Sequence, residues 1–187
     1  MIDPLTLPDD LPRPEDDGAA DHLLGQLMPE ISLPTTDGDS LALSGLGRNG
    51  TAILFCYPWT GRPGEPLLVE EWNSIPGARG CTPETCGFRD LHTDFEAAGA
   101  RVFGLSTQDT TYQTELAERL ELRFPILSDE GLELTHALRL PTMEVAGRTL
   151  IKRLTLVVDD GKISMVFYPV FPPDRHASEV LAWLRER

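Results

Sequence analysis

Two cysteines five positions apart, Cys81 and Cys86, are the residues of this sequence whose types and spacing best suit chemistry. The residues around them predict a helix. Thr82 can cap its N-terminus, and Pro83 suits the first helical position, where no N–H is needed. An apolar pattern then continues to a stop signal at Gly99. The sequence therefore predicts one thiol at the mouth of a helix and the other inside it.

The position of Cys81 favours nucleophilic chemistry. Unpaired N–H groups at a helix N-terminus stabilise a thiolate over a thiol, so we expect a reactive sulfur near neutral pH. Five helical residues separate two Cα atoms by roughly 9 Å, beyond the ~7 Å limit for a disulfide. Cys81 and Cys86 can therefore form a bond only if the first helical turn unwinds.

Other interpretations of this segment stay open. The helix can simply carry two half-buried thiols, because free cysteine is commonly buried. A metal site would need more ligands than the segment offers, since His92 is the nearest additional donor and the spacing matches no familiar zinc pattern. Residues 45–50 have a G-x-G-x-x-G spacing, but they precede an apolar run instead of following a strand. We expect neither a metal nor a bound cofactor.

Composition excludes several classes of partner. The chain has 187 residues, with 30 acidic against 16 basic side chains and a net charge of −14, which opposes binding to nucleic acid or anionic membranes. No apolar run approaches a membrane span. Three cysteines form no disulfide framework, so we expect a reducing compartment and a cytoplasmic protein.

The first 24 residues differ in composition from the rest. Residues 1–24 hold seven acidic side chains and four prolines, a mixture that buries little, so we expect an extended N-terminal arm, with an arm ordered against the body as the alternative. Residues 25–187 are long enough for one domain with a proper core.

The body alternates strand and helix patterns. Residues 51–57 form an apolar, β-branched run bounded by Gly50 and Pro58, which predicts a central strand. Hairpins are expected at 31–43 and 154–168, and a helix is expected to open on a capping box at 110–113. The remaining segments predict strands at 101–106 and 124–127, a short helix capped by Asp129, and a last helix that starts at 172–174. The order predicts an α/β sandwich with a central mixed sheet flanked by helices.

Residues 58–80 are irregular and lead directly to Cys81. They contain four prolines, four glycines and the tryptophans Trp59 and Trp72. A loop of this length inside a compact domain is often functional. It can be a lid or a substrate wall, and equally a separate apolar cluster or a subunit contact.

These motifs together resemble the peroxiredoxins, specifically the Q-type or bacterioferritin-comigratory branch, over residues 27–184. Residues 80–90, with cysteines five apart, look like that branch's peroxidatic and resolving pair. Residues 55–58, 104–107 and 124–129 are similar to its strands, and Arg153 resembles its active-site arginine. The resemblance implies a thioredoxin-like fold for residues 25–187.

The resemblance also implies a function. Cys81 would reduce hydrogen peroxide or an organic hydroperoxide and become a sulfenic acid, with Arg153 holding the thiolate. Cys86 would resolve it as an intramolecular disulfide, which a thioredoxin-type dithiol would reduce. We expect a monomer or weak homodimer. The alternatives are a thiol–disulfide reductase or redox sensor without efficient peroxidase activity, and a non-catalytic thioredoxin-like binding module.

The sequence departs from the family pattern at one point. The family places a proline seven residues and a threonine three residues before the peroxidatic cysteine, whereas here these positions hold Ser74 and Ala78. Pro58 and Thr60 lie before what resembles an insertion. The threonine hydroxyl that would orient the peroxide is therefore absent or supplied from elsewhere.

Overall fold

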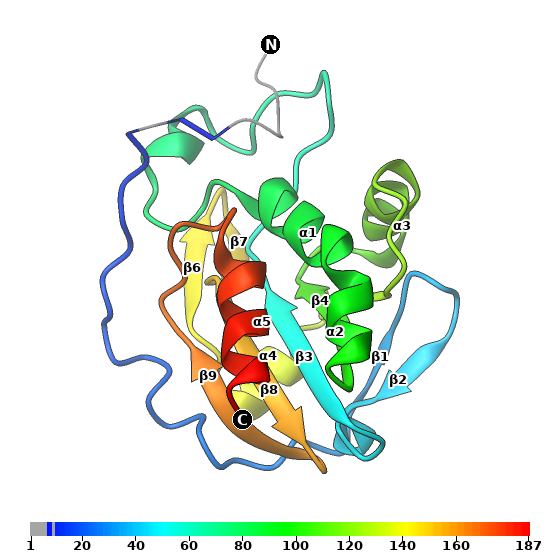
Figure 1. Ribbon diagram of the computed structural model, residues 1–187. Coiled ribbons are helices and arrows are strands. Elements are labelled where there is room, and N and C mark those ends of the chain that lie inside the picture. Colours follow the sequence, from blue (N-terminus) through cyan, green and yellow to red (C-terminus); the bar gives the residue numbers. More distant parts are fainter. Residues whose placement is uncertain (1–6, 9) are drawn as a thin grey trace.

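A five-stranded mixed sheet runs through the middle of the computed structural model, which describes residues 7, 8 and 10–187 (Figure 1). Its strand order is β5–β4–β3–β8–β9. The strands of the chain are β1 (Ser32–Pro34), β2 (Ser40–Ala42), β3 (Thr51–Cys56), β4 (Ala100–Ser106), β5 (Ile126–Ser128), β6 (Thr142–Val145), β7 (Arg148–Ile151), β8 (Leu154–Asp159) and β9 (Lys162–Phe167). The helices are α1 (Cys81–Asp90), α2 (His92–Ala97), α3 (Thr110–Arg119), α4 (Glu133–Leu138) and α5 (His176–Arg185), with short 3-10 turns at Leu43–Gly45 and Glu70–Ser74.

The central strand is β3, as its apolar run predicts. It pairs in parallel with β4 and antiparallel with β8, and every side chain from Ala52 to Cys56 is buried. Both faces are apolar because helices or loops cover both sides of the sheet. The expected mixed sheet and the hairpins β1–β2 and β8–β9 are confirmed.

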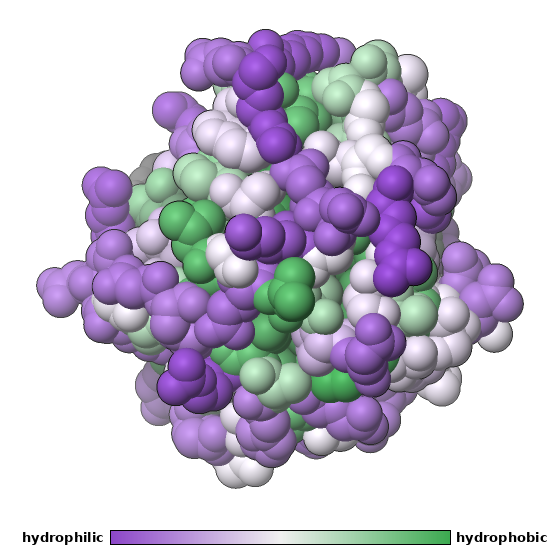
Figure 2. Space-filling model, turned by 90° about the horizontal axis from the view of Figure 1, so that it is seen from below, coloured by the Kyte–Doolittle hydropathy of each residue, from purple (hydrophilic) through white to green (hydrophobic). Residues whose placement is uncertain are grey.

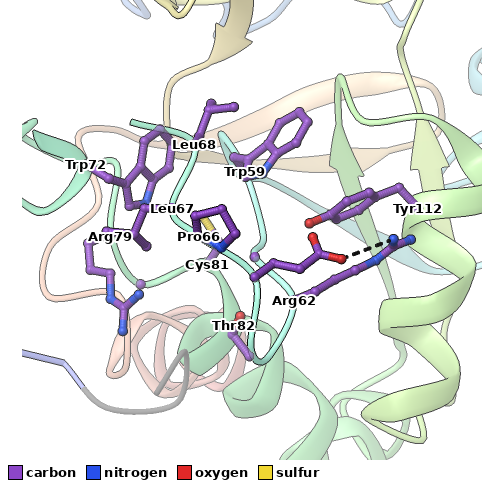
Figure 3. A pocket seen from close by; sticks show the side chains of 13 residues that line it. Trp59, Arg62, Pro66, Leu67, Leu68, Trp72, Arg79, Cys81, Thr82 and Tyr112 are labelled. Carbon is purple, nitrogen blue, oxygen red and sulfur yellow. Dashed lines mark ion pairs between the residues drawn. The ribbon is translucent and has the colours of Figure 1, made fainter. Parts of the chain in front are cut away.

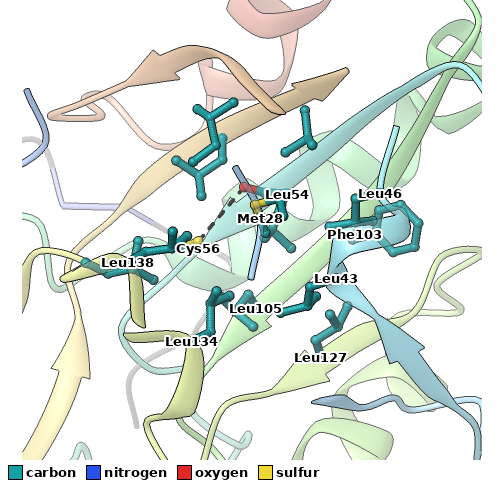
Figure 4. Close-up of a cluster of buried hydrophobic side chains, with 14 of the residues drawn as sticks. Met28, Leu43, Leu46, Leu54, Cys56, Phe103, Leu105, Leu127, Leu134 and Leu138 are labelled. Atoms are coloured by element: carbon teal, nitrogen blue, oxygen red, sulfur yellow. Dashed lines mark hydrogen bonds between the residues drawn. The ribbon is translucent and has the colours of Figure 1, made fainter. Parts of the chain in front are cut away.

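Two apolar clusters lie on opposite faces of this sheet. The first cluster packs α4 and the N-terminal segments against one face, with Leu54 and Leu105 at its centre (Figure 4). The second cluster lies under α1, α2 and α5, where Phe88 of α1 stacks on Phe55 of β3 at a centroid distance of 4.3 Å. This contact fixes the height of α1 above the sheet, and therefore the position of its first residue, Cys81.

The N-terminal arm packs on the body more closely than its composition predicts. Ala20 and Leu23 are buried in the first cluster, and the Asp17 carboxylate accepts hydrogen bonds from Lys152 (2.6 Å) and Tyr168 (2.7 Å). Residues 25–28 then hydrogen-bond to the beginning of β9, which covers that edge of the sheet. The arm is thus tied to the domain from residue 17 onward; residues 1–6 and 9 lie outside the described residues.

The surface is mainly polar on the side seen in Figure 2, with apolar residues scattered among hydrophilic ones. Leu24 and Leu27, at 61% and 70% exposure, are the large apolar side chains most open to solvent in the described chain. None of the helices within residues 10–187 has the length and apolar character needed to cross a bilayer.

Several local predictions need correction. The helix after Cys81 is not continuous to Gly99, because it breaks at Leu91 into α1 and α2. Its N-cap is Gly80 at φ +109°, not Thr82, so Cys81 itself is the first helical residue. Glycine suits this cap because the left-handed region strains any other residue.

Three further differences concern caps and short strands. Helix α3 is capped by Asp109, whose side chain accepts the N–H of Tyr112, instead of by a box at 110–113. Helix α5 begins at His176, after the predicted start at 172–174. The hairpin β6–β7 was not predicted.

Candidate active site

Cys81 lies at the base of a pocket of about 280 Å³ (Figure 3). Its side chain is 2% exposed, and its thiol donates to the carbonyl oxygen of Ala78 at 3.5 Å. The pocket walls come mostly from loop 58–80, which contributes Trp59, Arg62, Leu67, Leu68 and Trp72, while α3 contributes Tyr112. The sulfur is therefore covered by the protein but faces a cavity of its own.

Among the described residues, Arg153 is the one whose positively charged side chain hydrogen-bonds to this sulfur. It lies between β7 and β8, is 3% exposed, and donates from Nη2 to Cys81 Sγ at 3.2 Å. The same Nη2 lies 3.1–3.3 Å from the carbonyl oxygens of residues 77, 78 and 79. The last residues of loop 58–80 thus surround the guanidinium with carbonyl groups. Several hydrogen bonds together, and not a single one, hold Arg153 beside Cys81.

Glu84 completes the charged centre. It lies one turn after Cys81 in α1, is fully buried, and accepts a hydrogen bond from Nη1 of Arg153. Burial raises the pKa of Glu84 to about 7, although the Arg153 guanidinium opposes the rise. One guanidinium therefore faces two acidic groups, the Glu84 carboxyl and the Cys81 thiol, which compete for its charge.

Burial in this closed pocket opposes the expected stabilisation of a thiolate at Cys81. Burial raises the pKa of the Cys81 thiol above its usual value, and the Arg153 guanidinium opposes the rise. The Glu84 carboxylate raises this pKa further, while the main-chain N–H of Trp59 lowers it. Desolvation is the largest of these influences, because burial disfavours the charged form of the thiol.

Cys86 is half-buried on the same intact helix as Cys81. All three cysteines are free thiols, and burial raises the pKa of Cys86. A bond between Cys81 and Cys86 would require the first turn of α1 to open. Cys56, in β3, is fully buried in the first cluster, where it fills the core as expected.

Neither Ala78 nor Thr60 directs a hydroxyl group at the Cys81 sulfur. Ala78, at the family's threonine position, offers the sulfur only its carbonyl group. Thr60 is fully buried, and its hydroxyl donates to Oε1 of Gln108 at 2.9 Å. The Thr60 hydroxyl is therefore directed at Gln108 and not at Cys81.

Loop 58–80 forms both a pocket wall and a separate apolar cluster, two of the four possibilities that the sequence left open. Trp59 packs on Tyr112 at a centroid distance of 5.4 Å, and Arg62 lies 4.1 Å above the same ring, so these side chains form one pocket wall. Trp72 is buried in a third apolar cluster with Val145 of β6. The loop is a wall that rests on the β6–β7 hairpin.

Sequence reasoning missed Glu84, Gln108 and the Trp59 amide. Glu84 had a usable signal, since a residue three positions after Cys81 in a helix lies on the same face. No sequence signal pointed to Gln108, because it lies 48 residues from its partner Thr60 and in no recognised motif.

Comparisons with known proteins agree with this geometry. A family model described as Redoxin matches residues 23–183. The chloroplastic peroxiredoxin Q of Populus jackii is 31% identical over 162 residues, 86% of this chain and 67% of that protein. The putative peroxiredoxin MT1643 of Mycobacterium tuberculosis (strain CDC 1551 / Oshkosh) is 31% identical, over 86% of this chain and 95% of that protein.

Solved structures are similar over the same span. The crystal structure of peroxidoxin BcpB from Mycobacterium tuberculosis has a TM-score of 0.70 at 31% identity, covering 87% of this chain and 96% of that one. The bacterioferritin comigratory protein of Xanthomonas campestris has a TM-score of 0.68 at 22% identity, over 88% and 98% of the two chains, and supports the thioredoxin-like fold alone. The chain therefore belongs to the Redoxin family, in its peroxiredoxin Q or bacterioferritin-comigratory branch, and is a thiol-dependent peroxidase.

Proposed function

We propose that Cys81 is the peroxidatic nucleophile and that Arg153 activates it. The observation that carries this proposal is the 3.2 Å contact between Arg153 Nη2 and Cys81 Sγ at the base of a pocket. The thiolate attacks the terminal oxygen of a hydroperoxide, so an S–O bond forms as the O–O bond breaks. The leaving oxygen takes up a proton and departs as water or an alcohol, and Cys81 becomes a sulfenic acid. Charge that spreads onto this oxygen is stabilised by hydrogen bonds from the guanidinium.

Cys86 then acts as the resolving residue. After the first turn of α1 opens, its sulfur attacks the sulfenic acid, a disulfide forms and water leaves. Two electrons from an external dithiol of the thioredoxin type return both thiols. The half-buried position of Cys86 supports this role, because a modest local opening is enough to free it.

The remaining assignments follow from the sequence pattern, the free thiols and the net charge. We assign residues 25–187 to the catalytic domain and residues 1–24 to an N-terminal arm, and we expect a monomer or weak homodimer. Three free thiols suit a cytoplasmic location. The net charge of −14 opposes nucleic acid and membrane partners.

Burial of Cys81 favours the peroxidase over a thiol–disulfide reductase. A sulfur that is 2% exposed admits a small peroxide through the pocket, but it cannot meet a disulfide on another protein without local unfolding. A thiol–disulfide reductase would need a reactive sulfur that is exposed at the protein surface.

The test is peroxide consumption with a thioredoxin system as reductant. Wild-type protein and the Cys56→Ser control should turn over, whereas Cys81→Ser should be inactive. Cys86→Ser should complete one oxidation and stop, leaving a sulfenic acid that dimedone traps. Normal turnover by Cys81→Ser would reject the proposal, and normal turnover by Cys86→Ser would remove Cys86 from its role.

A further inference from the structure

Gln108 holds the backbone of Thr60 from both sides. Its Oε1 accepts the Thr60 main-chain N–H at 3.0 Å and the hydroxyl at 2.9 Å, and its Nε2 donates to the Thr60 carbonyl oxygen at 3.1 Å. Gln108 is 1% exposed and Thr60 is fully buried, so water does not compete for these bonds. The peptide planes on either side of Thr60 are therefore fixed.

Gln108 is itself fixed to the sheet. Its main-chain N–H donates to the hydroxyl of Ser106 at 3.3 Å, and its carbonyl oxygen accepts the hydroxyl of Ser128 at 2.7 Å. Ser106 ends β4 and Ser128 ends β5. The amide side chain thus extends from two rigid strand ends toward the active-site loop.

A second anchor lies on the other side of Trp59. The N–H of Tyr57 donates to the carbonyl oxygen of Leu105 in β4 at 3.0 Å. Pro58 and Trp59 are therefore held between Tyr57 and Thr60, both attached to the end of β4. The main-chain N–H of Trp59 lowers the pKa of the Cys81 thiol, both residues line the same pocket, and the indole packs on Tyr112 in its wall.

We propose that the main-chain N–H of Trp59 does the work that the family gives to a threonine hydroxyl, and that Gln108 is the positioning residue that aims it at Cys81. This inference rests on the proposed function. An amide fixed beside a buried sulfur stabilises the thiolate, and then the charge that develops on the peroxide oxygens, without reorganising during the reaction. Residues 58–60 and 108 thereby compensate for the alanine at position 78.

The test compares Gln108→Leu with Gln113→Leu. Gln113 is an equally buried glutamine whose Nε2 donates to Ser106 and to the carbonyl oxygen of Leu127, so its loss disturbs the same polar region but no bond to Thr60. Both changes are made in a Cys56→Ser/Cys86→Ser background, where Cys81 is the one thiol. The measurements are the rate of Cys81 alkylation by iodoacetamide across pH and the rate of its oxidation by hydrogen peroxide.

Gln108→Leu should slow both reactions at pH 7 by about tenfold, the size of one hydrogen bond to a charged group, and should shift the alkylation profile to higher pH. Gln113→Leu should change stability but neither rate. If Gln108→Leu does not fold, Gln108→Asn replaces it. The shorter side chain of Asn cannot reach Thr60, so both reactions of Cys81 should again be slower. Equal rates for a folded Gln108 variant and its background would overturn the inference.

Thr60→Val separates the amide from the hydroxyl. It removes the Thr60 hydroxyl but keeps both main-chain bonds to Gln108, so we expect the peroxide rate to fall by no more than about threefold. A loss of about a hundredfold or more would mean that the hydroxyl acts on the substrate, which contradicts the inference. The Cys56→Ser/Cys86→Ser background protein separates failure of this inference from failure of the proposed function. If hydrogen peroxide does not oxidise this background protein, the proposed function itself is rejected.

Discussion

Replacing Glu84 with Gln should make Cys81 more reactive, and only above neutral pH. The substitution removes one of the two acidic groups that share Arg153 but keeps the shape of the side chain and an oxygen that accepts from Nη1. Arg153 should stay in place, because the carbonyl oxygens of residues 77–79 bind its Nη2 independently. The guanidinium then has the Cys81 thiolate as its one negatively charged partner.

The size and the pH window of the effect follow from the geometry. Two like charges a few ångströms apart repel by about 3 kcal/mol at an effective dielectric constant of 20, and each ~1.4 kcal/mol is tenfold. We therefore expect alkylation of Cys81 to be at least ~10-fold faster at pH 8 in Glu84→Gln. The pKa of Glu84 is about 7, so this carboxyl is already neutral in wild-type protein at pH 5.5, and the two rates should converge there.

The assay is iodoacetamide alkylation of the Cys56→Ser/Cys86→Ser protein from pH 5 to 9. Glu96→Gln is the matched control, since Glu96 is an exposed residue of α2 whose ion-pair partner is His92 at 3.6 Å. It removes the same formal charge from a site with no contact to Arg153. Slower alkylation of Cys81 in Glu84→Gln, or an equal increase in the alkylation rate at every pH, would refute the competition between the two acidic groups.

Three further predictions concern the pocket and the fold. Trp72→Ala opens a pocket wall, so kcat/KM should fall several-fold more for cumene hydroperoxide than for hydrogen peroxide, and an equal change would remove Trp72 from substrate binding. Phe88→Ala deletes the ring between α1 and β3 and should lower the free energy of unfolding by about 3–5 kcal/mol in urea titrations; a loss below ~1 kcal/mol would contradict this packing. His176 is buried beside Thr155, and burial lowers its pKa to about 3, so the unfolded chain binds a proton between pH 6.5 and 3 that the native state does not. Stability should therefore fall by a few kcal/mol as pH drops through this window, and His176→Gln should flatten the curve.

Strong local patterns made much of the fold predictable. The run in β3 is apolar on both faces, and Asp159-Asp160-Gly161 marks the turn between β8 and β9, so sequence alone identifies both. The β6–β7 hairpin escaped prediction because its strands are short and its turn, at Ala146 and Gly147, lacks the usual Asn-Gly or Asp-Gly signal.

The candidate site was predictable only in part. The spacing of Cys81 and Cys86 is a local property, and the resemblance pointed to Arg153. The raised pKa of the Cys81 thiol depends on burial under a loop that has no regular pattern, and no local rule describes it. The bond from Gln108 to Thr60 joins segments 48 residues apart, which only the folded chain brings together.

The most direct test of the account is a single oxidation of the reduced protein by hydrogen peroxide in a stopped-flow instrument, followed by the fluorescence of Trp59 and Trp72 in the pocket wall. The variants are Cys81→Ser and Arg153→Met combined with Glu84→Gln, so that no unpaired charge is buried. The account predicts a fast second-order phase that is lost in Cys81→Ser and slowed about a hundredfold or more without Arg153. A fast phase that survives either change would contradict it.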